Sequence, residues 1–245
     1  MKFDVIIPFC SEDNKYIQHC INGVKNLASS VIVTYWDRMF DGSEENMDII
    51  NILKIRNPNC RFIEIPYEKN ENMWWYYGHS RFVGYQNSSI DSSHVMFLDA
   101  DEIFEEKKLE QWLNLDIDFD VSYFANYWYF RDERYQAKTY EDSPVMVKKN
   151  KLELRYFYTN FDRRVFLTVD GIKKLRMTLG LDGLPMCHHY SWVLSKEKML
   201  KKVLRSAHKN DFDWSKLIDK EFDSEFRGID FIHGYKYNIL EKGYI

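Results

Sequence analysis

The chain has 245 residues, of which 45% are hydrophobic and 29% are charged, and its formal net charge is −4. This composition is typical of a globular domain and excludes an intrinsically disordered chain. The weak negative charge provides no basic field that would attract nucleic acid, so we predict no nucleic-acid partner. No apolar run approaches the roughly 20 residues that a membrane-spanning helix needs, so no transmembrane segment is expected.

The cysteines and the first residues of the chain indicate its compartment. The four cysteines form neither a CxxC pair nor a zinc-binding pattern; they are Cys10, Cys20, Cys60 and Cys187. Isolated thiols in a chain of this length favour a reducing compartment, and we expect a cytoplasmic protein. The opening MKFDVIIPFC has a short apolar run that Asp4 and Pro8 interrupt, without a small-residue cleavage site. We interpret it as a strand and not as a signal peptide.

Strands and helices are predicted to alternate over the first 104 residues. The β-branched run FDVIIPF (3–9) is typical of a strand buried on both faces. Further strands are predicted at 29–36, 60–67 and 94–104, and helices at 14–28, 43–57 and 73–89. Three such alternations predict an α/β fold with a doubly wound sheet and right-handed crossovers.

The second half of the chain is less regular. The aromatic segment 119–132 is expected to extend the sheet, and 151–169 is expected to form a hairpin. A Lys-rich helix is predicted over 195–210, with Ser195 as its N-cap. The sequence has no internal repeat and no Gly/Ser linker, so we predict one domain over 1–245.

Carboxylates gather where the predicted strands end. Ligands of doubly wound sheets bind outside the carboxyl ends of the strands, and Asp37, Asp99 and Asp101 lie at or just after such ends. In VMFLDADEIF (95–104), residues i and i+2 of an extended segment point to the same side, so Asp99 and Asp101 face one point. Two adjacent carboxylates raise each other's pKa unless a cation joins them. Oxygen ligands suit Mg²⁺ or Mn²⁺, completed by phosphate and water. The alternative is a solvated turn.

Three motifs in a fixed order resemble a known family. DVIIPFCSED (4–13), GHSRFVGYQNSS (78–89) and VMFLDADEIF (95–104) together look like family 2-type glycosyltransferases of the GT-A fold. The segment CHHYSWVLSKEKMLKK (187–202) resembles a His-Tyr-x-Trp segment found downstream in some members.

The resemblance implies a Rossmann-like, mostly parallel sheet flanked by helices, with a mixed second half on the acceptor side. Residues 1–110 would form the nucleotide-sugar-binding half, and 111–245 the acceptor half with C-terminal helices. The implied reaction is metal-dependent transfer of a sugar from a nucleotide-diphosphate donor, expected to be a UDP-sugar, to a glycan or other hydroxyl acceptor. The implied cofactor is Mn²⁺ or Mg²⁺.

The metal ligands are carried over from the DxD motif. Asp101 matches the second Asp, which contacts the metal. Asp99 matches the first Asp, nearer the ribose or a metal-bound water, and the small Ala100 separates the two. A distal histidine completes the metal shell in many GT-A enzymes, and the resemblance points to His189; a histidine of the core or of a loop is the alternative. Imidazole favours Mn²⁺ over Mg²⁺.

The nucleotide contacts are also carried over. Pro8, Phe9 and Ser11 match the loop that lies against the nucleoside, and Glu12 matches an acidic residue of that loop, with a role near the start of the helix as the alternative. Arg81 matches an arginine that approaches the nucleotide, and a surface helix arginine is its alternative.

Asp37 matches the residue that reads the base. A carboxylate there would accept the N3–H of uracil and reject a base that lacks this donor. The segment WDRMFDGSEEN departs from the family pattern because it also offers Asp41, which could instead belong to a turn.

An inverting transfer needs a general base that deprotonates the acceptor hydroxyl. Asp182, in GLDGLP, and Asp162 are the candidates, and Asp170 competes with them. Two other functions remain open. A nucleotidyltransferase of the same fold is disfavoured because PFCSEDNK lacks the glycines of a phosphate loop. A non-catalytic carbohydrate-binding module is disfavoured by the intact Asp99 and Asp101.

Overall fold

The structure is a computed structural model that describes residues 1–69, 71–205 and 209–245. Its strands are β1 (Phe3–Phe9), β2 (Ser30–Trp36), β3 (Arg61–Ile65), β4 (His94–Phe97), β5 (Glu102–Phe104), β6 (Val121–Phe130), β7 (Asp132–Lys148), β8 (Lys174–Thr178), β9 (Cys187–Trp192) and β10 (Tyr237–Ile239). Its helices are α1 (Asn14–Val24), α2 (Met47–Arg56), α3 (Met73–Gln86), α4 (Glu106–Leu113), α5 (Leu154–Phe157), α6 (Lys196–Leu204) and α7 (Trp214–Phe222), with short 3-10 turns η1 (Ser11–Asp13), η2 (Lys149–Lys151) and η3 (Asp162–Leu167).

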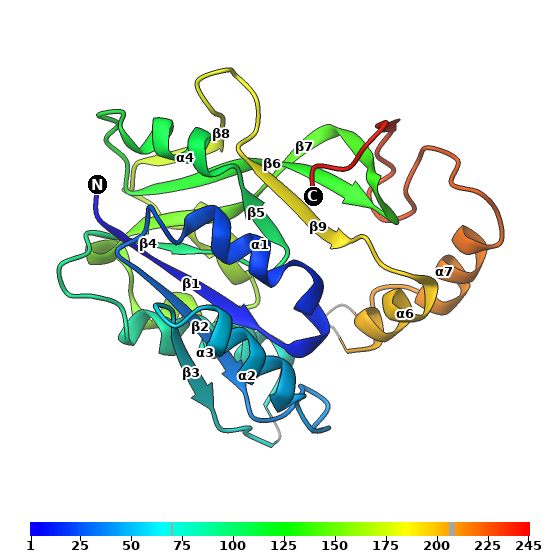
Figure 1. Ribbon diagram of the computed structural model, residues 1–245, viewed down its shortest axis with the longest axis horizontal. Helices are drawn as coiled ribbons and strands as arrows, with labels where there is room; N and C mark the ends of the chain where they lie inside the picture. The colour runs from blue at the N-terminus through cyan, green and yellow to red at the C-terminus, as the bar shows by residue number, and fades with distance from the viewer. Residues whose placement is uncertain (70, 206–208) are drawn as a thin grey trace.

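One curled sheet runs through the molecule in the order β3-β2-β1-β4-β7-β6-β9-β5, with β10 beside β7 and β8 beside β6 (Figure 1). The four strands of the first half pair in parallel, and β7 then joins β4 antiparallel. The second half mixes both directions, since β6 is antiparallel to β7 but parallel to β8 and β9. The predicted α/β class and the mostly parallel sheet flanked by helices are confirmed.

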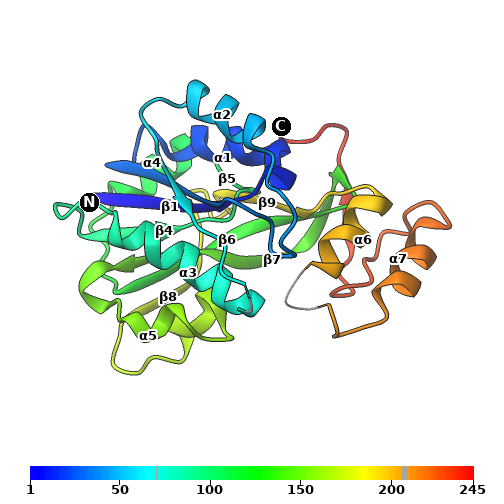
Figure 2. The same cartoon turned by 90° about the horizontal axis from the view of Figure 1, so that it is seen from below.

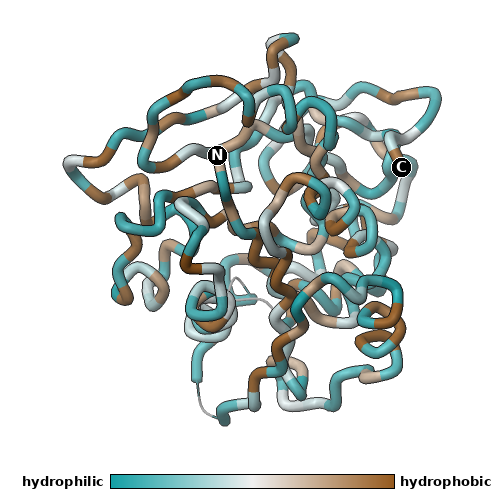
Figure 3. Tube along the Cα trace, turned by 60° about the vertical axis from the view of Figure 1, so that its left-hand side comes forward, coloured by the Kyte–Doolittle hydropathy of each residue, from teal (hydrophilic) through white to brown (hydrophobic). Residues whose placement is uncertain are grey.

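Helices cover both faces of the sheet (Figure 2). Helices α1, α2 and α4 pack on one face, where α1 buries Ile17, Cys20, Ile21 and Val24 at helical spacing. Helix α3, α5 and η3 pack on the other face, over Ile6 and the neighbouring strands. Hydrophobic stretches gather in the middle of the trace, and hydrophilic ones predominate along its outline (Figure 3).

A third cluster lies at the far end of the sheet. Met199 and Val203 of α6 and Ile218 of α7 pack there against Trp128 and Phe130 of β6. Helix α6 follows β9 directly, so this packing holds the helix near the point where β9 ends (Figure 1).

One glycine contact sets two helices close to each other. A Cβ at Gly78 would overlap the carbonyl oxygen of Phe157, so α3 and α5 approach each other closely. This approach brings Arg81, one turn further along α3, to the start of η3.

Most predicted elements are present, with four differences. Helix α2 begins at Met47 because Asn46 is its N-cap, with Asn46 Oδ1 accepting from the Ile49 N–H (3.3 Å). The predicted strand 94–104 is split into β4 and β5 by a turn at 98–101. The hairpin predicted over 151–169 is wrong, because this segment forms α5 and η3. Helix α6 is capped by Ser195 as predicted but ends at Leu204, and positions 206–208 of the predicted helix lie outside the described residues.

Candidate functional site

The turn between β4 and β5 presents Asp99 and Asp101 at the carboxyl end of a buried strand. The Glu102 N–H donates to the Asp99 carbonyl (3.1 Å), and the Asp99 N–H donates to Glu102 Oε2 (2.8 Å). The side chain of Glu102 is fully buried, and its hydrogen bond with Asp99 holds the turn in place from the protein interior. The chain therefore leaves the strand direction at Leu98, and the two aspartates face different surroundings.

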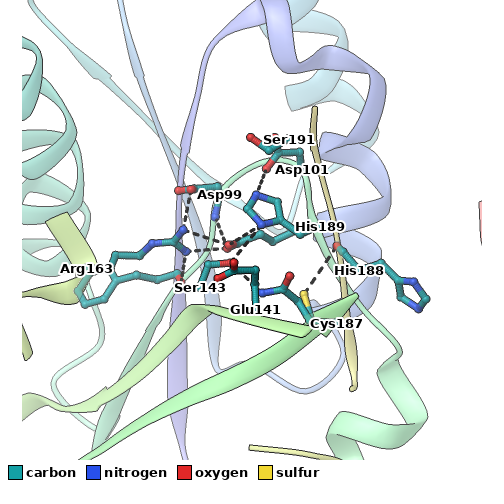
Figure 4. A network of polar contacts seen from close by, with 12 residues as sticks. Asp99, Asp101, Glu141, Ser143, Arg163, Cys187, His188, His189 and Ser191 are labelled. Atoms are coloured by element: carbon teal, nitrogen blue, oxygen red, sulfur yellow. Dashed lines mark hydrogen bonds and ion pairs between the residues drawn. The ribbon is translucent and has the colours of Figure 1, made fainter. Parts of the chain in front are cut away.

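Two arginines bind the carboxylate of Asp99, and Figure 4 shows the contact of Arg163. Arg163 Nη2 donates to Asp99 Oδ2 (2.7 Å), and Arg81 Nη2 donates to Asp99 Oδ1 (3.0 Å). Arg163 also binds both oxygens of Glu102, at 2.6 and 3.0 Å. Asp162 closes the network by pairing with Arg81. Burial alone would raise the pKa of Asp99, but the charges of Arg163 and Arg81 outweigh it and hold that pKa well below its usual range.

The second carboxylate is different. Asp101 is 8% exposed, and its Oδ1 has no hydrogen-bond partner within the described part of the chain. Two cationic or ligating groups lie near it: His189 Nε2 is 3.4 Å from Oδ1, and Lys202 Nζ is 3.8 Å from Oδ2. Among the described residues, Oδ1 therefore has an ion-pair contact but no hydrogen bond of the kind that buried carboxylate oxygens usually make, so it can accept a further partner.

His189 is oriented toward Asp101 (Figure 4). Its Nδ1 lies 3.2 Å from Ser143 Oγ on β7, and its ring packs edge-on against Trp128. The second ring nitrogen is thereby directed at Asp101. Burial alone would lower the pKa of His189, but the adjacent carboxylate of Asp101 outweighs it and raises that pKa. The neighbouring His188 faces away, with Nδ1 2.8 Å from the Tyr129 hydroxyl and Nε2 3.3 Å from Glu105.

A cavity of about 170 Å³ opens beside Asp101. It lies between η1, the start of α1 and the start of α6, and its lining comprises Glu12, Asp13, Lys15, Tyr16, Asp101, Tyr190, Ser191, Val193, Leu194, Ser195, Lys198 and Lys202. Burial raises the pKa of Asp13 to about 6, against the opposing charge of Lys202 and with a contribution from Asp101. The cavity therefore has charged groups of both signs on its wall.

The residues fit a divalent cation that a ligand completes. No cluster of three or more His, Cys, Asp or Glu side chains within residues 1–69, 71–205 and 209–245 is arranged to hold a metal by itself. Asp101 Oδ1 and His189 Nε2, however, are 3.4 Å apart, close to the roughly 3 Å between neighbouring ligands of an octahedral ion with bonds of about 2.1 Å. Both oxygens of Asp99 are bound to arginines; its predicted contact with the metal stays a prediction.

The loop after β1 contacts both the loop after β2 and α6. Phe9 is buried at the end of β1, beside Pro8, and the Ser11 N–H donates to Glu45 (3.2 Å). Glu12 accepts from Arg205 (2.6 Å) and pairs with Lys201. Glu12 thus lies near the start of α1, as its alternative role requires, and it also lines the cavity.

Asp37 and Asp41 are separated by the turn that follows β2. Asp37 is exposed, and its Oδ1 accepts from the Tyr67 N–H (2.7 Å). Asp41 Oδ1 accepts from the N–H and hydroxyl of Ser43 in a turn where Gly42 has φ 81°. Asp41 therefore forms the turn that the sequence offered as its alternative.

The two candidate bases lie apart. Asp162 contacts Arg81 and so belongs to the network of Asp99. Asp182 lies in the loop before β9, where it pairs with Lys108 of α4 (3.1 Å) and caps the Leu184 N–H (3.0 Å). The structure does not bring Asp182 to the Asp99–Asp101 turn. Sequence reasoning missed Arg163 and Lys202; only Lys202 has a sequence signal, the Lys-rich helix.

Comparisons with known proteins give similarity of architecture only. No model of a protein family matches the chain. No curated protein sequence matches it either. No helix among the described residues is both long and apolar enough to cross a bilayer.

Solved structures of two classes of transferase resemble the chain. A 4-diphosphocytidyl-2C-methyl-D-erythritol synthase from Anaerococcus prevotii has a TM-score of 0.49 at 12% identity, covering 81% of this chain and 95% of its own. The mannosyltransferase PcManGT from Pyrobaculum calidifontis, in complex with GDP-Man and Mn²⁺, has a TM-score of 0.49 at 10% identity, covering 83% of this chain and 61% of its own. The catalytic domain of Drosophila β1,4-galactosyltransferase 7 has a TM-score of 0.44 at 13% identity, covering 92% of this chain and 82% of its own. The reaction is therefore inferred from the site itself.

Proposed function

We propose that the chain is a metal-dependent glycosyltransferase that moves a sugar from a nucleotide-diphosphate donor to a hydroxyl of a glycan acceptor. The observation that supports it best is Asp101. Its unpartnered buried oxygen lies at the carboxyl end of a strand that pairs in parallel with β1, 3.4 Å from an imidazole nitrogen and beside a cavity. This is where ligands of such sheets bind.

Asp101 and His189 are the residues that would hold Mn²⁺, or Mg²⁺, together with phosphate oxygens and water. When bound, a divalent ion neutralises charge that develops on a leaving diphosphate. Ser143 keeps the His189 ring oriented, as outer-shell partners of metal-binding histidines do. Histidine as a ligand favours Mn²⁺.

The arginine network would hold the turn rigid while the donor binds. Arg81 and Arg163 occupy the inner side of Asp99, whose side chain remains 37% exposed and is available to a ribose hydroxyl. Asp37 is exposed at the end of β2, where its carboxylate would accept the N3–H of uracil. The backbone of 8–11 would lie against the nucleoside.

An inverting transfer would need a base on the acceptor side. Of the two carboxylates predicted for this role, Asp162 is the one that contacts the network at the strand end, with 29% of its side chain exposed. We assign it the role in this proposal, ahead of Asp182.

Titration calorimetry with UDP, GDP, CDP and ADP, with Mn²⁺ and with EDTA, tests the proposal. We expect one nucleotide to bind with Mn²⁺ and to lose most of its affinity in EDTA. Equal affinity in both conditions would contradict it. Turnover is then tested with the matching nucleotide sugars. Release of pyrophosphate from a nucleoside triphosphate and a sugar phosphate would instead identify a nucleotidyltransferase.

A further inference from the structure

Helix α6 presents four cations on one face. Lys198, Lys201, Lys202 and Arg205 are spaced by three, one and three positions, which places them on one side of a helix. Met199 and Val203 define the opposite, buried side, in the cluster with Trp128 and Trp214. We call the four cations the basic face.

The basic face is directed at the loops of the candidate donor site. Arg205 pairs with Glu12 (2.6 Å) and with Asp41 (2.7 Å), so it joins α6 to the loops after β1 and after β2. Lys201 also pairs with Glu12. The packed cluster on the other side of α6 leaves the helix little freedom to turn this face away.

Two lysines of the basic face line the cavity beside Asp101. The ammonium group of Lys202 donates to the carbonyl and hydroxyl of Ser191, at 2.7 and 2.8 Å, and stands 3.8 Å from Asp101 Oδ2. Lys198 lines the same cavity, and its ammonium group has no ion-pair partner within the described part of the chain. Of the two ammonium groups that α6 contributes to the cavity, one is held in place and one is available to a ligand.

The size of the cavity and the ammonium groups on its α6 side suit a small polyanion. Its volume of about 170 Å³ would hold five to six waters at about 30 Å³ each, which is comparable to a diphosphate group. Surface ion pairs contribute little to stability, so ion pairing alone does not explain why the four cations of the basic face gather beside the cavity. Ammonium groups bind phosphate as point charges.

We infer that the basic face of α6 is the diphosphate-binding wall of the donor site, with Lys202 and Lys198 donating to phosphate oxygens opposite Asp101. This inference rests on the proposed function for the identity of the donor. The chemistry itself requires only two linked phosphates, so it can be tested with and without a nucleoside.

Lys202→Gln and Lys198→Gln are compared with Lys196→Gln by calorimetry with pyrophosphate, UDP and uridine in Mn²⁺. Lys196 is the matched control because it lies on the same helix but pairs with Asp219 of α7 (2.9 Å). We expect the first two variants to weaken pyrophosphate and UDP by about tenfold and to leave uridine unchanged. The Lys196 variant should match the wild type. Since Lys198 supports no other residue, its variant keeps the test valid if Lys202→Gln unfolds.

The outcomes separate the inference from the proposed function. If UDP binds with Mn²⁺ and neither variant weakens it, or if uridine weakens equally, the basic face is not the diphosphate wall. If pyrophosphate binds through Lys202 while none of UDP, GDP, CDP and ADP binds, the wall stands and the nucleotide donor is wrong. If the wild type binds neither class of ligand, both are wrong.

Discussion

The two sides of the β4–β5 turn are built in opposite ways. On one side, Asp99 and Glu102 are neutralised by Arg81 and Arg163 at 2.6 to 3.0 Å. On the other, Asp101 keeps an unpartnered oxygen beside a cavity. One motif therefore contains a carboxylate that holds the turn and another that is open to a ligand. The difference teaches that the spacing of a DxD does not by itself say which carboxylate is held closely by arginines of the protein and which keeps an oxygen without a hydrogen bond.

Removal of Arg163 should have the largest effect, because it breaks the contacts that neutralise Asp99 and Glu102. Arg163→Met would leave the fully buried Glu102 and Asp99 without their main partner, and breaking a buried pair costs about 3–5 kcal/mol. Urea unfolding measures the change. Arg164→Met is the control, since Arg164 is 69% exposed and 3.7 Å from Glu141; it should change stability by less than about 0.5 kcal/mol. Equal losses in both variants would contradict the comparison.

Asp101→Asn should weaken ligand binding beside the cavity without disrupting the fold. Under the proposed function the substitution would remove a metal ligand. Since loss of an outer-shell partner alone costs 10–100-fold, we expect nucleotide affinity in Mn²⁺ to fall by about 100-fold. Its free energy of unfolding should fall only slightly, because Asp101 makes longer ion pairs, at 3.4 Å to His189 and 3.8 Å to Lys202. Asp99→Asn should lower stability more, by about 1–3 kcal/mol, because it weakens closer contacts to Arg81 and Arg163. Parallel calorimetry and urea unfolding would show whether the two carboxylates differ.

The two histidines of β9 sharpen the comparison further. His188→Ala should lower stability by about 2–3 kcal/mol, because it removes contacts to Tyr129 and Glu105 and a ring stacked on Tyr244 at 3.8 Å. His189→Ala should instead raise the Mn²⁺ concentration that nucleotide binding needs, with a smaller change in melting temperature. If both variants keep the wild-type Mn²⁺ dependence, neither histidine is a ligand.

A histidine lies buried at the other end of β4. Its Nε2 has no hydrogen-bond partner among the described residues, and burial, helped by Lys148 and the amino terminus, lowers the pKa of His94 to about 4. The unfolded chain binds this proton near pH 6.5, so stability falls as pH drops from 6.5 toward 4, by about 2 kcal/mol at pH 5. His94→Phe should flatten the pH dependence by that amount and leave nucleotide binding unchanged. An unaltered slope would show that another group titrates.

The first half of the fold follows from local sequence patterns, whereas the site depends on contacts between residues that are far apart in the sequence. The alternation of 3–9, 29–36 and 60–67 with amphipathic helices predicted the parallel strands correctly, because each βα unit buries its own apolar residues. The break of the predicted strand 94–104 at Leu98 was not predicted, since it depends on the ion pair between Glu102 and Arg163. Nothing in NFDRRVF distinguishes Arg163 from a surface arginine, because its partners lie 61 and 64 positions earlier in the chain. His189 could be named only by resemblance, and its role stays a prediction.

The pairing of Glu12 with Arg205 has a consequence for how the molecule is made. These residues are 193 positions apart, so the contact must wait until most of the chain has been synthesised. The parallel strands close over short separations and leave the ribosome first, while contacts of high sequence separation form slowly. We expect a nascent chain to acquire the sheet before α6 exists. The donor site would then be completed late in folding, when α6 docks onto the loop after β1.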